Sequence, residues 1–105
     1  MRDAVIVSTA RTPLTKAARG AFNNTTGATL GAFSIKAAVE RAGLSGAEID
    51  DVVMGTAAQQ GSTGGNVARL AALRAGLPVT VPAMTIDRQC SSGLMSIATA
   101  AKQIL

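Results

Sequence analysis

The single cysteine of the chain, Cys90, is followed by Ser91, Ser92 and Gly93, and this segment has the residue types of a nucleophilic site. It lies where a strand pattern ends and a helix pattern begins. Backbone N–H groups at the start of a helix have no partners within that helix, and the helix dipole favours negative charge there. Both effects stabilise a thiolate, the form of cysteine that attacks carbonyl carbons, and the same N–H groups can hold an oxyanion. Cys90 is therefore a candidate catalytic nucleophile.

A second interpretation of Cys90 stays open at this point, because a lone cysteine often serves as a small buried hydrophobic residue. Its place in a Ser/Gly-rich turn between strand and helix favours the reactive interpretation. The chain contains no histidine, so no Cys–His or Ser–His pair exists within it, and we expect no metal site. One cysteine cannot form an internal disulfide, which is typical of a reducing compartment. Arg88 either adds positive potential beside the thiol or is an ordinary surface residue.

Length and composition limit the class of protein. The 105 residues make at most one small domain, and 48% hydrophobic with only 15% charged residues excludes a disordered segment. No apolar run approaches the roughly 18 residues that a membrane span needs, and the first residues lack the apolar core of a secretion signal. We therefore expect a cytoplasmic protein without a membrane span. The net charge of +4 is dispersed and only 2% of residues are aromatic, which argues against nucleic-acid binding.

The remaining sequence alternates between strand and helix patterns. Residues that commonly begin or end a helix stand at the boundaries between them. Gly43 is placed to end a helix, Ser45 and Glu48 have the spacing of a capping box, and Asn66 is placed to cap a helix. The Gly-rich loop 55–65 matches no phosphate-binding pattern and is interpreted as a connector. The expected elements are a buried strand at 4–10, a helix at 28–42, strands at 51–56 and 82–87, a helix from 66 to 76, and a final helix after residue 93.

Such alternation predicts an α/β fold with right-handed crossovers and a largely parallel sheet. The last helix is apolar on most sides, and only a stripe that includes Ser92, Ser96 and Thr99 is polar. A helix of this kind is expected between two layers rather than on a surface. We therefore expect residues 1–105 to be the N-terminal piece of a longer protein.

Three segments resemble landmarks of one enzyme family in the same order. The segment 85–94, TIDRQCSSGL, closely resembles the nucleophile segment of thiolases, the acetyl-CoA acyltransferases. The segments 5–13, VIVSTARTP, and 66–78, NVARLAALRAGLP, look like the other N-terminal landmarks of that family. The departures are modest, since Thr15 and Ser91 stand where many members have Gly, and Asp87 where many have Asn. None of them touches the assignment of Cys90.

The resemblance implies the layered αβαβα thiolase fold, of which residues 1–105 would be the first βαβαβα portion, the N-terminal part of the N-terminal domain. Cys90 would carry the acyl group while a 3-oxoacyl-CoA, such as acetoacetyl-CoA, is formed or cleaved in fatty acid metabolism. Coenzyme A and acyl-CoA are substrates in this scheme, and no cofactor is tightly bound. The activating His and a second Cys lie in later sequence in that family, so we expect these 105 residues alone to be inactive.

The resemblance also implies an assembly, a homodimer or homotetramer. The short apolar segment 82–86 is expected at a sheet edge, where an unpaired strand invites another. Two alternative functions stay open. One is a ketoacyl-synthase-like condensing enzyme, because that family shares the fold and the cysteine. The other is a non-catalytic thiolase-like domain that binds lipid or acyl groups and keeps Cys90 for structural reasons.

Overall fold

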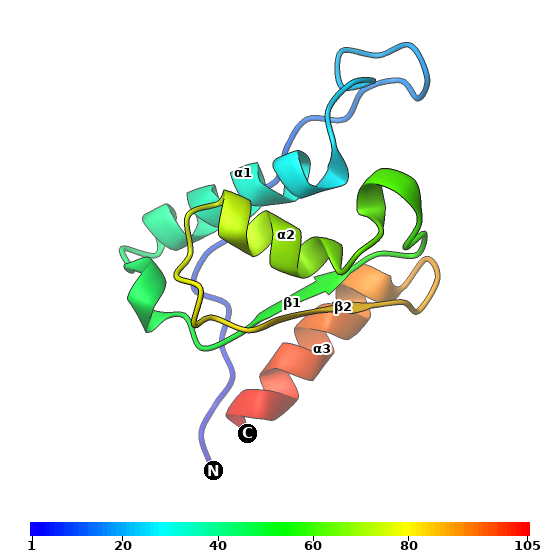
Figure 1. Ribbon diagram of the computed structural model, residues 1–105. Helices are drawn as coiled ribbons and strands as arrows, with labels where there is room; N and C mark the ends of the chain where they lie inside the picture. The colour runs from blue at the N-terminus through cyan, green and yellow to red at the C-terminus, as the bar shows by residue number, and fades with distance from the viewer.

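Two parallel strands form the sheet on which the other elements pack, in a computed structural model that describes residues 1–105 (Figure 1). Helices α1 and α2 lie on one side of the sheet and α3 lies on the other (Figure 1). The α/β class and the helix–strand alternation after residue 26 are thus as the sequence predicts. The elements are α1 (Gly27–Arg41), the 3-10 turn η1 (Gly46–Glu48), β1 (Val52–Gly55), the 3-10 turn η2 (Gly61–Thr63), α2 (Val67–Arg74), β2 (Ala83–Ile86) and α3 (Ser92–Ile104).

The strands β1 and β2 run parallel, with Val52 opposite Ala83 and Gly55 opposite Ile86. Helix α2 is the crossover between them, which is how parallel neighbours are normally joined. The pairing extends one residue further, because the Thr56 N–H donates to the Ile86 carbonyl at 2.9 Å. The carboxyl ends of both strands therefore lie together, beside the first turn of α3.

The core is made of small side chains on the α2 side of the sheet. Val67, Ala68, Ala71 and Ala72 are at most 2% exposed. The small residues let helices approach closely, since a methyl group added at Gly31 of α1 would lie 3.0 Å from the Ala71 Cβ. Leu77 and Val81 complete the core beside Ala72. The most deeply buried side chains of the chain therefore lie on this side of the sheet.

The ends of the helices are occupied by residues that favour these positions. The N–H of Thr29 donates to the Thr26 hydroxyl at 3.2 Å at the start of α1, and Gly43 ends this helix with a left-handed φ of 71°. In η1 the Glu48 carboxylate accepts the Ser45 N–H at 2.8 Å, as the capping-box spacing predicts. This hydrogen bond lowers the pKa of Glu48, and the Ser45 hydroxyl adds to the effect.

The buried strand predicted at residues 4–10 is absent, and this prediction is wrong. The segment makes no ladder, and Val5, Ile6 and Val7 are 69%, 73% and 73% exposed. The guanidinium of Arg41 holds it by donating to the Thr9 carbonyl at 2.8 Å. A β-branched run satisfies the local pattern of a strand, but a ladder also requires a neighbour with free N–H and C=O groups. Strand β1 pairs only with β2 here.

Helix α3 also differs from expectation, because its buried residues are polar. Ser92 and Ser96 are 4% and 7% exposed, while Leu94 is 72% and Ile97 55% exposed. The helix therefore places its serine stripe against β1 and turns most of its apolar surface outward. A cavity of about 400 Å³ separates α3 from residues 4–6. None of the helices has the length and hydropathy of a membrane span.

Candidate active site

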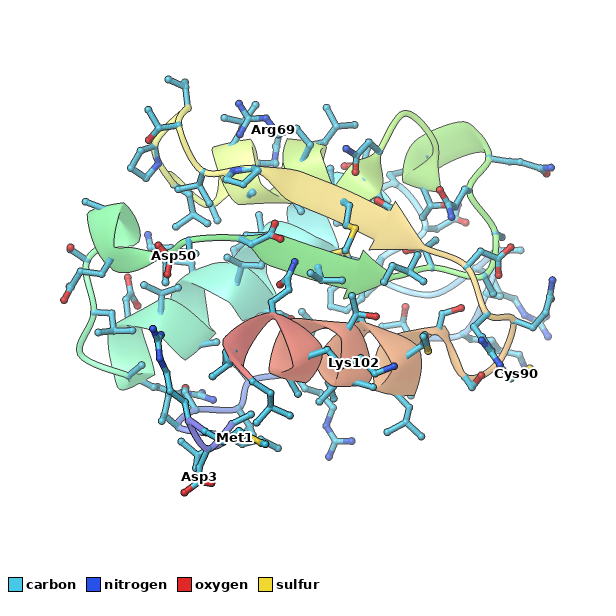
Figure 2. The ribbon with its side chains drawn as sticks, turned by 90° about the horizontal axis from the view of Figure 1, so that it is seen from below. Met1, Asp3, Asp50, Arg69, Cys90 and Lys102 are labelled. Atoms are coloured by element: carbon cyan, nitrogen blue, oxygen red, sulfur yellow. The ribbon has the colours of Figure 1, made fainter.

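Cys90 lies in the turn that joins β2 to α3, which comprises residues 87–92 and is called the Cys90 turn below. Figure 2 shows the labelled cysteine at this end of the sheet. Its thiol is free and exposed. The predicted position between strand and helix is confirmed, and the interpretation of Cys90 as a small buried hydrophobic residue does not fit this structure.

Side chains within the Cys90 turn hold two of three successive backbone N–H groups. The Arg88 N–H donates to the Ser92 hydroxyl at 2.8 Å, and the Gln89 N–H donates to the Asp87 carboxylate at 2.8 Å. The third N–H, that of Cys90 itself, has no acceptor in the chain. Gln89 has a left-handed φ of 49°, which turns the backbone sharply just before the cysteine. The turn therefore presents a thiol and an unused N–H donor on the same residue.

The two serines after Cys90 close the turn in different ways. Ser91 donates through its N–H and its hydroxyl to the Arg88 carbonyl, at 3.1 and 2.9 Å. Ser92 donates likewise to the Gln89 carbonyl, at 3.1 and 2.6 Å. Ser92 is buried whereas Ser91 is exposed. Asp87 stands where many family members have Asn, and this difference keeps the hydrogen bond. The atom that accepts the Gln89 N–H is a side-chain oxygen that Asn also carries.

Gly55, at the end of β1, brings the sheet into contact with the start of α3. A Cβ at this position would lie 2.2 Å from the Ser92 carbonyl carbon and 2.5 Å from the Gly93 nitrogen. These are backbone atoms, so only a residue without a side chain permits this approach. The contact fixes where α3 begins, and with it the position of the Cys90 turn.

The segment 66–78, one of the family landmarks, fixes the strand that leads to Cys90. The Asn66 side chain donates to the Ala83 carbonyl at 3.0 Å and accepts from the Thr85 hydroxyl at 2.8 Å. The Thr85 hydroxyl also accepts the Ala68 N–H at 3.1 Å. Arg69 donates to the Val79 carbonyl at 2.9 Å and to the Val81 carbonyl. These bonds join the start of α2 to β2 and to the segment before it.

The prediction that the Asn66 side chain caps α2 is wrong. Asn66 occupies the N-cap position with a left-handed φ of 56°, and its side chain makes no cap hydrogen bond. A cap residue normally has an extended backbone, from which its side chain reaches back to the helix. In the left-handed conformation the amide reaches β2 instead. Sequence reasoning included Thr85 and Ser92 in the motif around Cys90 but did not predict their contacts, and it missed the role of Gly55, for which the only signal was a glycine at a strand end.

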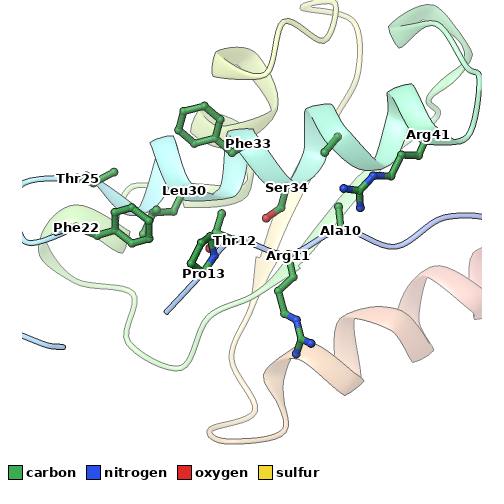
Figure 3. Close-up of a pocket in the computed structure, with 11 residues that line it drawn as sticks. Ala10, Arg11, Thr12, Pro13, Phe22, Thr25, Leu30, Phe33, Ser34 and Arg41 are labelled. Atoms are coloured by element: carbon green, nitrogen blue, oxygen red, sulfur yellow. The ribbon is translucent and has the colours of Figure 1, made fainter. Parts of the chain in front are cut away.

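A separate recess of about 390 Å³ lies between α1 and residues 10–13 (Figure 3). Its labelled walls include Pro13, Phe22 and Leu30, with Arg11 and Arg41 at one end (Figure 3). No residue of the Cys90 turn lines it. The recess is therefore distinct from the candidate active site.

Comparison with known proteins identifies the family. The family described as thiolase, N-terminal domain, matches residues 4–105. A 3-ketoacyl-CoA thiolase of Bacillus subtilis and an acetyl-CoA acetyltransferase of Cupriavidus necator are each 48% identical to the whole chain. The crystal structure of the Bacillus anthracis acetyl-CoA acetyltransferase is similar with a TM-score of 0.91 and 41% identity over 99% of this chain. The chain therefore belongs to the thiolase family.

The chain is much shorter than the proteins that it matches. It spans 27% and 26% of the two relatives and 26% of the chain in the crystal structure. Other relatives, 43% and 41% identical, are named as a peroxisomal 3-ketoacyl-CoA thiolase of Arabidopsis thaliana and a mitochondrial acetyl-CoA acetyltransferase of Xenopus tropicalis. The predicted thiolase-like fold class is confirmed for the part of the fold that these residues form.

Proposed function

We propose that this chain supplies the acyl-carrying cysteine of a thiolase-type acyltransferase that forms or cleaves 3-oxoacyl-CoA, such as acetoacetyl-CoA. The observation that carries the proposal is the exposed Cys90 thiol beside its own unused N–H, in a turn that belongs to a thiolase N-terminal domain. Coenzyme A and acyl-CoA are the substrates. The names of the relatives favour thiolase chemistry over a ketoacyl synthase or a non-catalytic domain.

The reaction has two steps. The Cys90 thiolate attacks the carbonyl carbon of the acyl group, a C–S bond forms, and the electron pair of the C=O bond moves to oxygen. The Cys90 N–H, in reach of an oxygen on that carbon, stabilises the oxyanion by a hydrogen bond. Collapse of the oxyanion expels the leaving group and leaves a thioester on Cys90. The acyl group then passes to coenzyme A or to an acetyl-CoA enolate. These 105 residues contain no histidine, and in this proposal the histidine that activates the thiol would belong to the longer enzyme, as the family resemblance implies.

The proposal includes the setting of the chain. Residues 1–105 would be the first portion of the N-terminal domain of a longer cytoplasmic enzyme, a homodimer or homotetramer. Strand β2 supports assembly, because β1 pairs with only one of its edges. Light scattering at micromolar concentration tests the assembly, and a monomer would contradict it. Cell fractionation tests the location.

The catalytic role is tested by turnover in the full-length polypeptide that carries this chain. Cleavage of acetoacetyl-CoA by coenzyme A is measured for the unchanged protein and for Cys90→Ala and Cys90→Ser. Both variants are expected to lose at least about a thousandfold in kcat, because a hydroxyl without a matched base is a much weaker nucleophile. Ser96→Ala, which alters a serine of α3 outside the Cys90 turn, serves as the control. Turnover by Cys90→Ala at the unchanged rate would contradict the proposal.

A further inference from the structure

We propose that Ser92 is a positioning residue that aims the Cys90 N–H at the oxyanion, an inference that rests on the proposed acyl transfer. Its hydroxyl accepts the Arg88 N–H at 2.8 Å and donates to the Gln89 carbonyl at 2.6 Å. One side chain thus holds the two residues that precede Cys90. Ser92 does not touch the reacting atoms and acts only through the backbone of the turn.

The geometry of the peptide bond links Ser92 to the Cys90 N–H. The Gln89 carbonyl and the Cys90 N–H belong to the same peptide group, which is planar and trans. In such a group the C=O and N–H bonds point in opposite directions. When Ser92 fixes the carbonyl on the inner side of the turn, the N–H is directed outward, where it has no acceptor in the chain. Without this constraint the peptide plane can rotate, and the Cys90 N–H no longer points in one fixed direction.

The surroundings of Ser92 make its hydroxyl suited to this task. The residue is 4% exposed, and the close contact of Gly55 with its carbonyl carbon fixes its backbone. A buried hydroxyl with both a donor and an acceptor partner has little freedom to reorient. Ser91, by contrast, is exposed and bonds to the Arg88 carbonyl, which does not belong to the peptide group of the Cys90 N–H.

Ser96 offers a matched control, because it is also a buried serine of α3 whose hydroxyl donates to the carbonyl three residues earlier, and it makes no hydrogen bond to the Cys90 turn. It lies one turn further along α3, is 7% exposed and donates its hydroxyl to the Gly93 carbonyl at 2.7 Å. Ser96→Ala therefore removes a buried hydroxyl of the same helix without touching residues 87–92. A general loss of packing in α3 should appear in both variants.

Two probes separate the reactivity of the thiol from the aim of the N–H. 4-Nitrophenyl acetate acylates the thiolate: a C–S bond forms, the carbonyl electron pair moves to oxygen, and its return breaks the C–O bond to release 4-nitrophenolate. Iodoacetamide alkylates the same thiolate by displacing iodide, and no oxyanion forms. The ratio of the two rates therefore reports oxyanion stabilisation alone. Both rates are read on the tryptic peptide 89–102, which carries the only cysteine of these 105 residues.

We expect Ser92→Ala to lower the acylation-to-alkylation ratio by about tenfold, since the Ser92 N–H still contacts the Gln89 carbonyl and only part of the constraint is lost. Ser96→Ala should keep the ratio within about twofold. Equal ratios in Ser92→Ala and the unchanged chain would overturn the proposal. The result does not depend on acetyl-CoA, so it is distinct from a failure of the proposed function.

Hydrogen exchange of the unchanged chain tests the same geometry without a substitution, should Ser92→Ala lose its helical circular dichroism. The Arg88 amide should exchange at least about tenfold more slowly than the Cys90 amide, because Ser92 accepts only the former. Exchange of the Arg88 amide as fast as that of Cys90 would show that Ser92 does not hold the turn and would overturn the proposal.

Discussion

The helices on the two faces of the sheet bury different kinds of side chain. Helix α2 buries Val67 and three alanines, so that its buried side chains are all apolar. Helix α3 buries Ser92 and Ser96 instead and leaves Leu94 and Ile97 more than half exposed. One face is packed for burial of apolar surface, and the other is joined through hydroxyl groups and a glycine contact.

The difference separates stability from positioning. Burial of apolar groups is not directional and tolerates small shifts, whereas a hydroxyl between a donor and an acceptor defines the positions of both. The α2 side therefore holds the most deeply buried apolar side chains, and the α3 side fixes the turn that carries Cys90. Substitutions on the two sides should differ in kind, and the following predictions test this from the largest effect to the smallest.

Gly55→Ala should have the largest effect on the free energy of unfolding. The added Cβ would lie 2.2 Å from backbone atoms of α3 that cannot move aside, and we expect a loss of about 3 kcal/mol or more. Gly93→Ala is the matched control, because a Cβ there meets nothing within 4 Å. In the first turn of a helix this control should be neutral or stabilising by up to about 1 kcal/mol. Urea denaturation measures both, and equal losses would refute the role of the Gly55 contact.

Val67→Ala should cost about 2 kcal/mol, because the side chain is 2% exposed and its removal leaves a gap in the core. Leu94→Ala removes a larger side chain from α3 but should change stability by at most about 0.5 kcal/mol, since Leu94 is 72% exposed. Thermal unfolding of the two variants compares the two faces directly. A greater loss for Leu94→Ala would reverse the assignment of the stabilising side.

Asn66→Ala should cost about 1 to 2 kcal/mol through the loss of the bonds to Ala83 and Thr85 and the strain of a left-handed alanine. Asn66→Gly removes the same bonds but accepts this backbone conformation without strain, so it separates the two contributions. Denaturant midpoints measure the difference. If both variants are as stable as the unchanged chain, the hydrogen bonds between Asn66 and β2 do not contribute to the free energy of unfolding.

Glu48→Gln should have the smallest effect, confined to η1. The pKa of Glu48 is lowered from its ordinary value of 4.5, so the carboxylate stabilises the folded chain above that value. This contribution is lost as the pH falls through the lowered pKa. Unfolding curves between neutral pH and pH values below 4.5 should show a slightly smaller acid dependence for Glu48→Gln. An identical acid dependence would show that the capping box does not couple to folding.

The sequence predicts those features that depend on neighbouring residues. Gly43, the pair Ser45 and Glu48, and the turn around Cys90 are local signals, and each appears in the structure where expected. Features that depend on distant partners were missed. Residues 4–10 have strand character but no ladder partner, and the Asn66 amide turns toward β2 because its backbone is left-handed. Ser92 looked like part of a polar stripe, and only its contact with Gly55 and the Cys90 turn shows its position.

The central claim is that Cys90 carries the acyl group, and covalent labelling tests it most directly. The full-length polypeptide is incubated with isotopically labelled acetyl-CoA, quenched in acid and digested with trypsin. We predict labelled acetyl on the peptide 89–102, located on Cys90 by fragmentation and absent in Cys90→Ser. Label on another residue, or turnover of acetoacetyl-CoA with no acetyl on this peptide under conditions that preserve thioesters, would contradict the claim.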